Sequence, residues 1–500
     1  MKTQLKEVSG SVVAPKGFLA GGVFCDIKRL GTGKGSNKGQ KRDLALIVSE
    51  VPATVAGMFT TNQVCAAPVK ICVERVKKGI AHAIVVNSGN ANACTGKQGL
   101  NDAREMTKIA AEAISREGRH VAVPKIRDSG PSSVAILRRV DMLSLPKISA
   151  GHVLVGSTGR IGVTLPMANV KRGILAAAKV LGNSKAHADQ AVEAIMTSDT
   201  RPKQIAVEFK LGGKTVRIGG MCKGAGMIQP GMSATGARPA ALPLQRFNAS
   251  TLHATMLCFI TTDAAIEAKT LQVVLQEAVA QSFNRVTVDG DMSTNDTVLV
   301  LANGLAGNPI LKDGARVLSS PKIKRLGLDG VSPHRDFEIF QSALNHVCLE
   351  LAKMIVRDGE GVHRIVTVRV NGAKSIQDAD AAARAVANSP LVKTSWHGGD
   401  PNWGRIICAL GYSLANIVEG NVDIGYSVSG SKKVLWSLKR GQPTRATFKQ
   451  LCAAVAPKEF DLHINLNLGK AGAVIYAADL TEEYVDFNKG DVGDPTSLGG

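Results

Sequence analysis

A chain of 500 residues with 44% hydrophobic and 20% charged residues can bury a large core, which excludes an intrinsically disordered protein and suggests two or three structural units. The formal net charge of +20 raises the question of nucleic-acid binding, but only 4% of the residues are aromatic and no zinc-finger or RNP-type signature occurs. We interpret the excess charge as solvated basic loops around an enzyme with anionic substrates, and we expect no nucleic-acid partner.

Cysteine usage and hydropathy bear on the compartment. Nine cysteines are scattered singly without a CxxC pair, which favours reduced thiols over a disulfide framework. No apolar run reaches the roughly 18 residues that would span a membrane, and the start MKTQLKEVSG lacks the apolar core of a signal peptide. We expect a cytoplasmic protein without a membrane partner, with the mitochondrial matrix or plastid stroma as the alternative.

Predicted strands and helices alternate in the first part of the chain. Apolar runs bounded by Gly and Pro predict strands within residues 10–24 and 43–50, separated by an exposed Gly/Lys-rich loop at 31–42. That loop lacks the GxxxxGK[ST] spacing of a phosphate-binding loop. Residues 80–93 predict a buried strand that runs into a turn, and residues 101–114, which start with Asn and Asp, predict a capped amphipathic helix.

Two irregular stretches interrupt this alternation. Residues 118–150 and 231–253 are rich in Gly, Pro, Ser and mixed charges, and we interpret both as insertions. Between them the sequence predicts a strand entering a Gly-punctuated turn at 153–166, then a helix, then a hairpin that turns at 212–213.

The alternation resumes after the second insertion. Residues 254–266 predict a strand, residues 270–283 a helix and residues 285–296 a strand and turn. A pair of strands is expected near the C-terminus, before a Gly-rich tail. The predicted fold class is therefore α/β.

An Ala-Thr pair opens the apolar run at 254–266. Cleavage of the bond before Thr255 would give this one residue both a hydroxyl nucleophile and a free α-amine. An α-amine with an ordinary pKa of about 7.7–8.0 is partly neutral at physiological pH and can act as the local base. A β-branched Thr is also ordinary strand packing, so the pair alone does not decide between the two interpretations.

Further motifs follow in order along the chain, and together they are far more specific than this pair. They are APKGFLAGGV, DLALIVSEVPATVAGMFTTN, AAPVK, VVNSGNANACTG, STGRIG, MTSDTRPK, GGMCKGAGMI, ATML, SFNRVTVDGDMSTNDTVLVLANG, IVRDGEG, SPLVKT and DPNWGRI. Through them the chain resembles the ornithine acetyltransferase family, the glutamate N-acetyltransferases of the cyclic arginine pathway, over most of residues 10–488. The resemblance implies a layered α/β sandwich related to N-terminal-nucleophile enzymes.

The resemblance also implies the residues that carry the chemistry. Thr255 in ATML matches the nucleophile, and Ala254 matches the last residue before the self-cleavage point. Thr158 and Gly159 in STGRIG match the pair that stabilises the oxyanion during acyl transfer. Standing alone, this Thr-Gly pair would be interpreted as a plain tight turn.

Four more residues match substrate-binding positions of the family: Lys223 in GGMCKGAGMI, Thr197 in TSDTRPK, Glu360 in RDGEG and Asn488 in DFNKG. A Lys flanked by glycines can reach a substrate carboxylate, and a Glu suits the cationic groups of ornithine. Without the resemblance, both would be interpreted as solvated surface residues. The sequence departs from the family after Asn488, because Gly493 stands where a Thr is usual and Thr496 is out of register, so we leave Thr496 out of the site.

Other polar residues nearby are not assigned to a metal or a nucleotide. Asp289, Asp291 and Asp296 in VDGDMSTND lack the Gly and Glu spacing of an EF-hand, which favours turn capping. His253 lies within an insertion, and an N-terminal Thr needs no His base. No HExxH, no CxxC and no GxGxxG after a strand occurs, so we expect no metal and no cofactor.

The expected activity is acetyl transfer from N-acetylornithine to glutamate by a ping-pong acyl-threonine mechanism. By the resemblance, self-cleavage gives an α-chain of residues 1–254 and a β-chain of residues 255–500, which stay together as an α2β2 assembly. Whether acetyl-CoA is a second acetyl donor stays open. Two alternatives remain: an N-terminal-nucleophile amidohydrolase or aminopeptidase, and a member with impaired maturation. The second arises because the family has only a couple of residues where this chain has 231–253; a gene-model origin of that insertion stays open.

Overall fold

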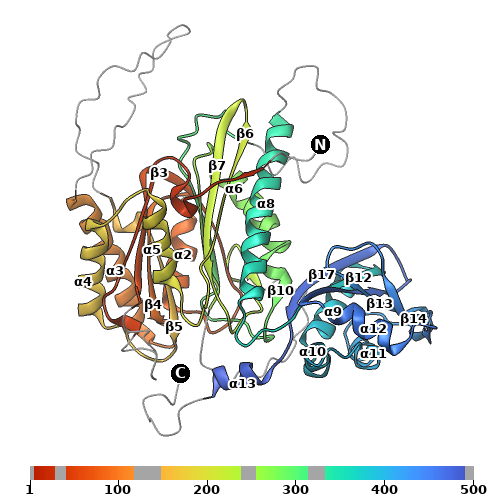
Figure 1. The fold of residues 1–500 in the computed structure, drawn as a ribbon. Coiled ribbons are helices and arrows are strands. Elements are labelled where there is room, and N and C mark those ends of the chain that lie inside the picture. The colour runs from red at the N-terminus through yellow and green to blue at the C-terminus, as the bar shows by residue number, and fades with distance from the viewer. Residues whose placement is uncertain (1–4, 29–40, 118–147, 238–254, 313–332, 490–500) are drawn as a thin grey trace.

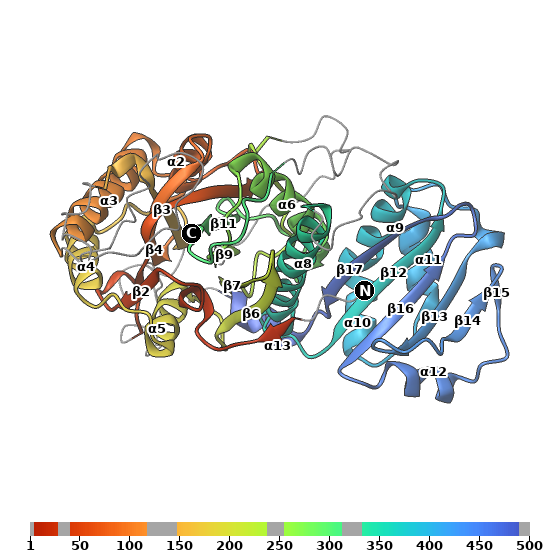
Figure 2. The same ribbon diagram turned by 90° about the horizontal axis from the view of Figure 1, so that it is seen from above.

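Two β-sheets organise the chain. The computed structural model describes residues 5–28, 41–117, 148–237, 255–312 and 333–489. Figure 1 shows the larger sheet with its helices beside a smaller unit, drawn in blue, that is built from the C-terminal part of the chain. Figure 2 shows the same arrangement from above.

Within the described residues the larger sheet has ten strands, and its main path runs β1-β6-β7-β9-β11-β3-β4-β5, with β2 and β8 also paired to β3. The strands are β1 (Lys6–Glu7), β2 (Phe18–Val23), β3 (Leu44–Thr60), β4 (Ile80–Asn90), β5 (Val153–Arg160), β6 (Lys203–Leu211), β7 (Lys214–Lys223), β8 (Met232–Ser233), β9 (Leu257–Thr262) and β11 (Thr297–Ala302). Most of the pairs are antiparallel, whereas β4 with β5 and β9 with β11 are parallel.

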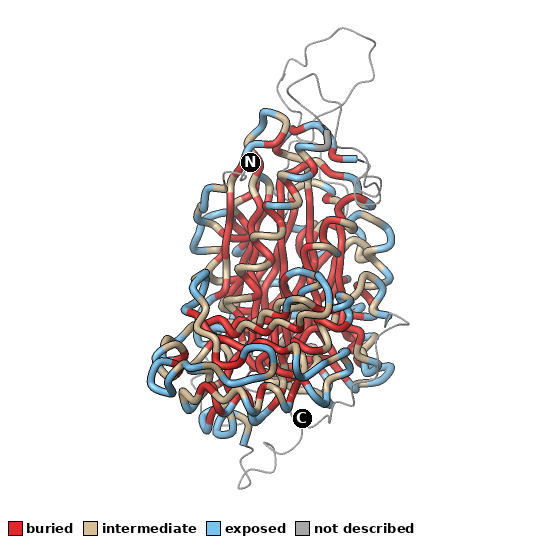
Figure 3. Tube along the Cα trace, turned by 90° about the vertical axis from the view of Figure 1, so that its right-hand side faces the viewer, coloured by how far each residue is buried: buried red, intermediate tan, exposed pale blue. Residues whose placement is uncertain are grey.

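Helices cover both faces of this sheet. They are α2 (Ala67–Val76), α3 (Gly96–Arg116), α4 (Met167–Lys179), α5 (Lys185–Ile195), α6 (Ala268–Ala280) and α8 (Pro333–Arg357). Leu257 and Phe259 of β9 join one hydrophobic core with α2 to α5, whereas Cys258 and Ile260 join a second core with α6 and α8. Alternate residues of a strand point to opposite faces, so β9, which is apolar from Leu257 to Ile260, is buried on both sides. Figure 3 shows buried positions running along the strands.

The smaller sheet follows the order β10-β17-β12-β16-β13-β14-β15 and encloses a third core with its helices. Its strands are β10 (Val286–Thr287), β12 (Ile365–Ala373), β13 (Asp423–Val428), β14 (Leu435–Lys439), β15 (Gln442–Pro443), β16 (Glu459–Asn465) and β17 (Ala471–Ala478). The helices of this part are α9 (Ile376–Asn388), α10 (Pro390–His397), α11 (Trp403–Gly411) and α12 (Phe448–Val455). Helix α13 (Glu482–Asn488) follows β17 and contributes no residue to this core. The two C-terminal strands expected as a pair do not pair with each other, because β12 lies between β16 and β17.

The predicted α/β class is confirmed, with one helix boundary placed wrongly. The helix expected to start at Asn101 begins at Gly96, because Asn92 and Thr95 already organise the turn before it. Thr95 Oγ1 donates to Asn92 Oδ1 at 2.7 Å, and Asn92 Nδ2 donates to the Gly99 carbonyl at 2.9 Å. The loop at 31–42 and the insertion at 118–150 lie almost wholly outside the described residues. Of the insertion at 231–253, residues 231–237 are described, and they include β8, which pairs with β3.

Segments on both sides of Thr255 contribute to the same sheet. Strands β9 and β11 follow Thr255 in the chain, yet they lie between β7 and β3, which precede it. A cut before Thr255 would therefore leave two chains held together by backbone hydrogen bonds of one sheet as well as by two shared cores. None of the described helices has the length and apolar character needed to cross a membrane.

Candidate active site around Thr255

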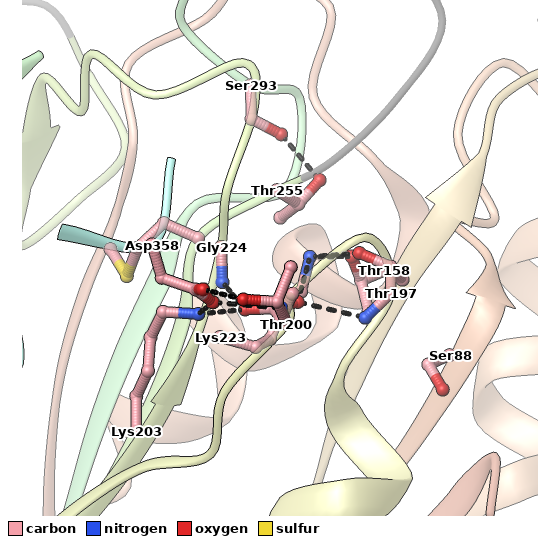
Figure 4. A network of polar contacts seen from close by, with 12 residues as sticks. Ser88, Thr158, Thr197, Thr200, Lys203, Lys223, Gly224, Thr255, Ser293 and Asp358 are labelled. Carbon is pink, nitrogen blue, oxygen red and sulfur yellow. Dashed lines mark hydrogen bonds and ion pairs between the residues drawn. The ribbon is translucent and has the colours of Figure 1, made fainter. Parts of the chain in front are cut away.

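Thr255 lies just before β9, and its neighbours come from the segment just before β11. Because β9 and β11 are parallel and Leu257 pairs with Thr297, residues 255–256 and 293–296 emerge at the same edge of the sheet. The Thr255 side chain is buried, and its Oγ1 lies 2.7 Å from Ser293 Oγ (Figure 4). On the other side, the Met256 amide donates to Asp296 Oδ1 at 3.0 Å. The hydroxyl and the backbone that carries it are thus held by one short segment.

Thr158 and Gly159 precede Arg160, the last residue of β5, and Figure 4 shows Thr158 in the polar network of Lys223. Thr158 is fully buried. Gly159 has a φ of 128°, a backbone conformation that residues other than glycine rarely adopt. A Cβ on Gly159 would lie 2.3 Å from the carbonyl carbon of Gly89 on β4. Packing therefore requires glycine here, and the close approach turns the backbone at the end of β5. Asn295 supports this turn, because its Nδ2 donates to the Ser157 carbonyl at 2.9 Å.

Lys223 connects the turn of β5 with the segment after α5. It is the last residue of β7 and is fully buried. Its Nζ donates to Thr197 Oγ1 at 2.7 Å and to Thr158 Oγ1 at 3.2 Å (Figure 4). Burial lowers the pKa of the Lys223 ammonium group, and the Asp199 carboxylate, 3.9 Å away, opposes that effect. Three residues named from the family motifs therefore share one hydrogen-bond network.

A buried ion network holds the loop that carries Thr197. Lys203 Nζ donates to Asp199 Oδ1 at 2.6 Å and to Asp358 Oδ2, and all three side chains are buried. Asp199 also accepts from the amides of Gly224 at 2.7 Å and Thr197 at 2.9 Å. Although burial alone would raise it, the ammonium groups of Lys203 and Lys223 hold the pKa of Asp199 below its usual range. The network keeps Asp199 charged beside Lys223.

Glu360 and Asn488 form a second group beside the segment after β7. The Glu360 amide donates to the Ala225 carbonyl at 2.9 Å, and Asn488 Nδ2 donates to Glu360 Oε2 at 3.1 Å. A Cβ on Gly226 would lie 2.4 Å from that same carboxylate oxygen, so Gly226 leaves room for it. Burial raises the pKa of Glu360. Helix α13, which carries Asn488, thereby connects the C-terminal part of the chain to the site.

Two of the acidic residues of VDGDMSTND, Asp289 and Asp296, accept hydrogen bonds from backbone amides. The Asp289 carboxylate accepts hydrogen bonds from the amides of Met227 at 2.6 Å and Ile228 at 2.9 Å. Within its own turn it also accepts from the amide of Asp291 at 3.2 Å. The turn-capping interpretation therefore covers part of its role, and the remaining bonds hold the segment after Lys223. Ala254 and His253 lie outside the described residues. Among the described residues, no group of three or more His, Cys, Asp or Glu side chains is arranged to hold a metal ion.

The Asp296 carboxyl makes the folded state sensitive to pH. Burial raises its pKa to about 8 from an ordinary value of 3.8. The folded chain therefore binds this proton more tightly than the unfolded chain, and the associated stability, complete below about pH 4, is lost as pH rises towards 8. Asp296→Asn, whose amide stays neutral, should become more stable relative to the parent as pH rises through that window.

Urea unfolding at a series of pH values would test this, with Thr255→Ala in both chains to keep each in one piece. Asp189→Asn is the control, because Asp189 has a pKa below its usual value and its contribution has the opposite sign with pH. If the difference in unfolding free energy between Asp296→Asn and its parent stays the same from pH 4 to 8, the result would contradict a protonated Asp296.

Comparison with known proteins shows which family the chain belongs to. The model of the ArgJ family matches residues 28–125 and 133–490. A bifunctional arginine-biosynthesis protein ArgJ of Symbiobacterium thermophilum is 42% identical over 481 residues, 96% of this chain and 98% of that protein. A glutamate N-acetyltransferase of Methanocaldococcus jannaschii is 39% identical over 491 residues, 97% of this chain and 99% of that protein. The chain belongs to the ArgJ family.

Solved structures include relatives of the same kind. A chain of the Mycobacterium tuberculosis ornithine acetyltransferase, described as complexed with ornithine, has 33% sequence identity and a TM-score of 0.37. The match covers 46% of this chain and all of that one.

Proposed function

We propose that the chain transfers an acetyl group from N-acetylornithine to glutamate, with Thr255 as the covalent nucleophile. The observation that carries this proposal is a buried threonine hydroxyl beside a polar network of Thr158, Lys223 and Thr197, in a chain of the ArgJ family. The names of its relatives, glutamate N-acetyltransferase and ornithine acetyltransferase, support the same reaction.

The residues divide into a reacting group and two binding groups. Thr255 Oγ attacks the acetyl carbonyl, and donors at Thr158 and Gly159 stabilise the negative charge that develops on its oxygen. Lys223 orients the hydroxyls of Thr158 and Thr197 and supplies positive charge for a substrate carboxylate. The amide C–N bond breaks and ornithine leaves, and the amine of glutamate then accepts the acetyl group from the threonine ester. None of these steps uses a cofactor.

The second binding group suits cationic substrate atoms. Glu360 is buried with Asn488 as its hydrogen-bond donor, and an ammonium group of ornithine would provide the positive charge that favours its ionised form. We propose that this pair binds the one free amino group of N-acetylornithine, whose other nitrogen is an uncharged amide. Gly493 lies outside the described residues, so the departure after Asn488 stays a sequence observation.

Maturation and assembly complete the proposal. We propose self-cleavage between Ala254 and Thr255, which frees the α-amine of Thr255 as a base. The interlocked order of β7, β9, β11 and β3 would keep the resulting α- and β-chains together, and α2β2 is the assembly we propose. A cytoplasmic site and the use of acetyl-CoA as an additional donor are proposed on the family relationship alone.

An acetylated Thr255 should accumulate when the cleaved enzyme meets N-acetylornithine without glutamate. Intact mass and peptide mapping of the chain that begins at Thr255 would detect it, and added glutamate should discharge it as N-acetylglutamate. Parallel measurement of free acetate separates transfer from hydrolysis. Rapid acetate release that glutamate does not suppress would favour the amidohydrolase alternative, and glutamate-dependent transfer without an acetylated Thr255 would overturn the covalent mechanism.

A further inference from the structure

A threonine at a chain start is badly placed to deprotonate its own hydroxyl. The α-amine and Oγ are attached to neighbouring carbons, so a direct O–H···N contact would be bent well below the roughly 120° at which hydrogen bonds weaken steeply. Efficient proton transfer needs a group that lies within hydrogen-bond distance of both atoms. Such a group has to be an acceptor for Oγ and a donor to the amine at the same time.

The Ser293 hydroxyl has the required hydrogen-bonding capacity. A serine hydroxyl has one donor hydrogen and two acceptor lone pairs. The Asn295 amide donates to Ser293 Oγ at 3.1 Å and so occupies one lone pair. The Ser293 and Thr255 hydroxyls form a 2.7 Å hydrogen bond in which either oxygen can be the donor. When Thr255 donates to the second lone pair, the Ser293 hydrogen is free for another acceptor. Because Ser293 is fully buried, bulk water does not compete for these bonds.

The position of Ser293 is fixed from several sides. Its carbonyl accepts from Thr60 Oγ1 on β3 at 2.7 Å. The neighbouring Asn295 donates through Nδ2 to the carbonyls of Ala91 at 2.7 Å and Ser157 at 2.9 Å. The segment that carries Ser293 is therefore held to β3 and to β5, the strand that contains Thr158 and Gly159. A group that transfers a proton needs such a fixed position.

The other polar groups around Thr255 do not fit this role. Asp296 has one oxygen bound to the Met256 amide, and burial raises its pKa to about 8, so it is largely protonated at neutral pH. Lys223 directs Nζ at the hydroxyls of Thr158 and Thr197. Ser293 is the described side chain whose hydroxyl contacts the Thr255 hydroxyl directly.

We propose that the Ser293 hydroxyl relays the proton between Oγ and the α-amine of Thr255, an inference that rests on the proposed function. As the bond from Thr255 Oγ to the acetyl carbon forms, the Oγ–H bond breaks and its proton passes to Ser293 Oγ. The Ser293 proton passes to the α-amine, which becomes an ammonium group. When the tetrahedral intermediate collapses, the α-ammonium group gives a proton to Ser293 Oγ, and Ser293 passes its own proton to the departing amine of ornithine. The α-amine and the Ser293 hydroxyl regain their starting protonation, and Thr255 Oγ stays acetylated.

Single-turnover acetylation of Thr255 by N-acetylornithine would test the relay in wild type, Ser293→Ala and Ser293→Thr. Acetylated and free Thr255 are counted by mass spectrometry per cleaved chain, so that impaired self-cleavage does not enter the rate. We expect Ser293→Ala to lower the acetylation rate about 10²- to 10⁴-fold, the usual range for general acid–base groups, with an unchanged KM. Ser293→Thr, which keeps a hydroxyl, should recover most of the rate.

Ser282→Ala is the matched control, because Ser282 is also fully buried. Ser282 follows α6, and its hydroxyl donates to the carbonyl of Ala278 in that helix at 2.6 Å. It should retain the wild-type rate. A Ser293→Ala rate within threefold of wild type would overturn the relay while leaving the proposed function intact. Failure of the wild-type enzyme to acetylate Thr255 would instead count against the proposed function.

A measurement on the wild-type enzyme alone keeps the proposal testable if Ser293→Ala does not mature. In mixtures of H2O and D2O, a step that moves two protons together gives a curved dependence of the rate on the deuterium fraction. A step that moves one proton gives a straight line. The relay predicts curvature in the acetylation step, and a straight line in a deuterium-sensitive acetylation step would contradict it.

Discussion

Thr255→Ala is expected to leave the chain in one piece and to abolish acetyl transfer. In the proposed mechanism this hydroxyl attacks both the Ala254 carbonyl during maturation and the acetyl carbonyl during turnover, and the substitution removes it. Loss of a covalent nucleophile costs on the order of 10⁶-fold in a serine hydrolase, so activity should fall below detection. Intact mass of the purified chain beside wild type would show one uncut species in place of two fragments that meet at Ala254–Thr255.

Two further variants make this result specific. Thr255→Ser keeps a hydroxyl and should still be cut. Thr261→Ala lies on the same strand, where the Thr261 hydroxyl donates to the Val12 carbonyl at 2.8 Å, and should be cut as wild type is. A Thr255→Ala chain that is still cut at this bond would point to an external protease. An uncut wild-type chain would mean that the insertion at 231–253 prevents maturation.

Lys203→Met is expected to destabilise the protein by about 3–5 kcal/mol, the range for removing one partner of a buried ion pair. The change leaves Asp199 and Asp358 buried without their shared ammonium group. The Thr200 hydroxyl and the amides of Thr200 and Arg201 continue to bind Asp358, but they do not neutralise a charge. Urea unfolding of the variant and its parent, both carrying Thr255→Ala, measures the loss.

The control for this prediction lies on the same strand. Lys210 is exposed and donates to Thr215 Oγ1 at 2.6 Å, so Lys210→Met should change the free energy of unfolding by no more than about 0.5 kcal/mol. Equal effects at Lys203 and Lys210 would show that the buried network does not hold the loop. Because Asp199 also binds the amides of Thr197 and Gly224, Lys203→Met should in addition weaken substrate binding.

Sequence motifs indicated the residues proposed to carry the chemistry but not the residues that hold them in place. Thr255, Thr158, Thr197 and Lys223 each stood in a recognisable motif, and the structure places them around one point. Ser293 lies in the motif VDGDMSTND together with Asp289, Asp291 and Asp296. Nothing in the pattern of this motif indicates the contact of the Ser293 hydroxyl with Thr255. A lone serine in a turn has many ordinary roles, and only a contact across 38 residues distinguishes this one.

The sequence by itself located many of the strands and helices before residue 297, because hydrophobic period and turn residues act over a few neighbouring positions. It also determined the family, since many motifs recur in order. The tertiary structure decided which segments meet. Parallel pairing of β9 with β11 brings residues 293–296 to Thr255, and Lys203 meets Asp358 from 155 residues away. Such contacts follow from sheet order and burial in three dimensions, which no local pattern encodes.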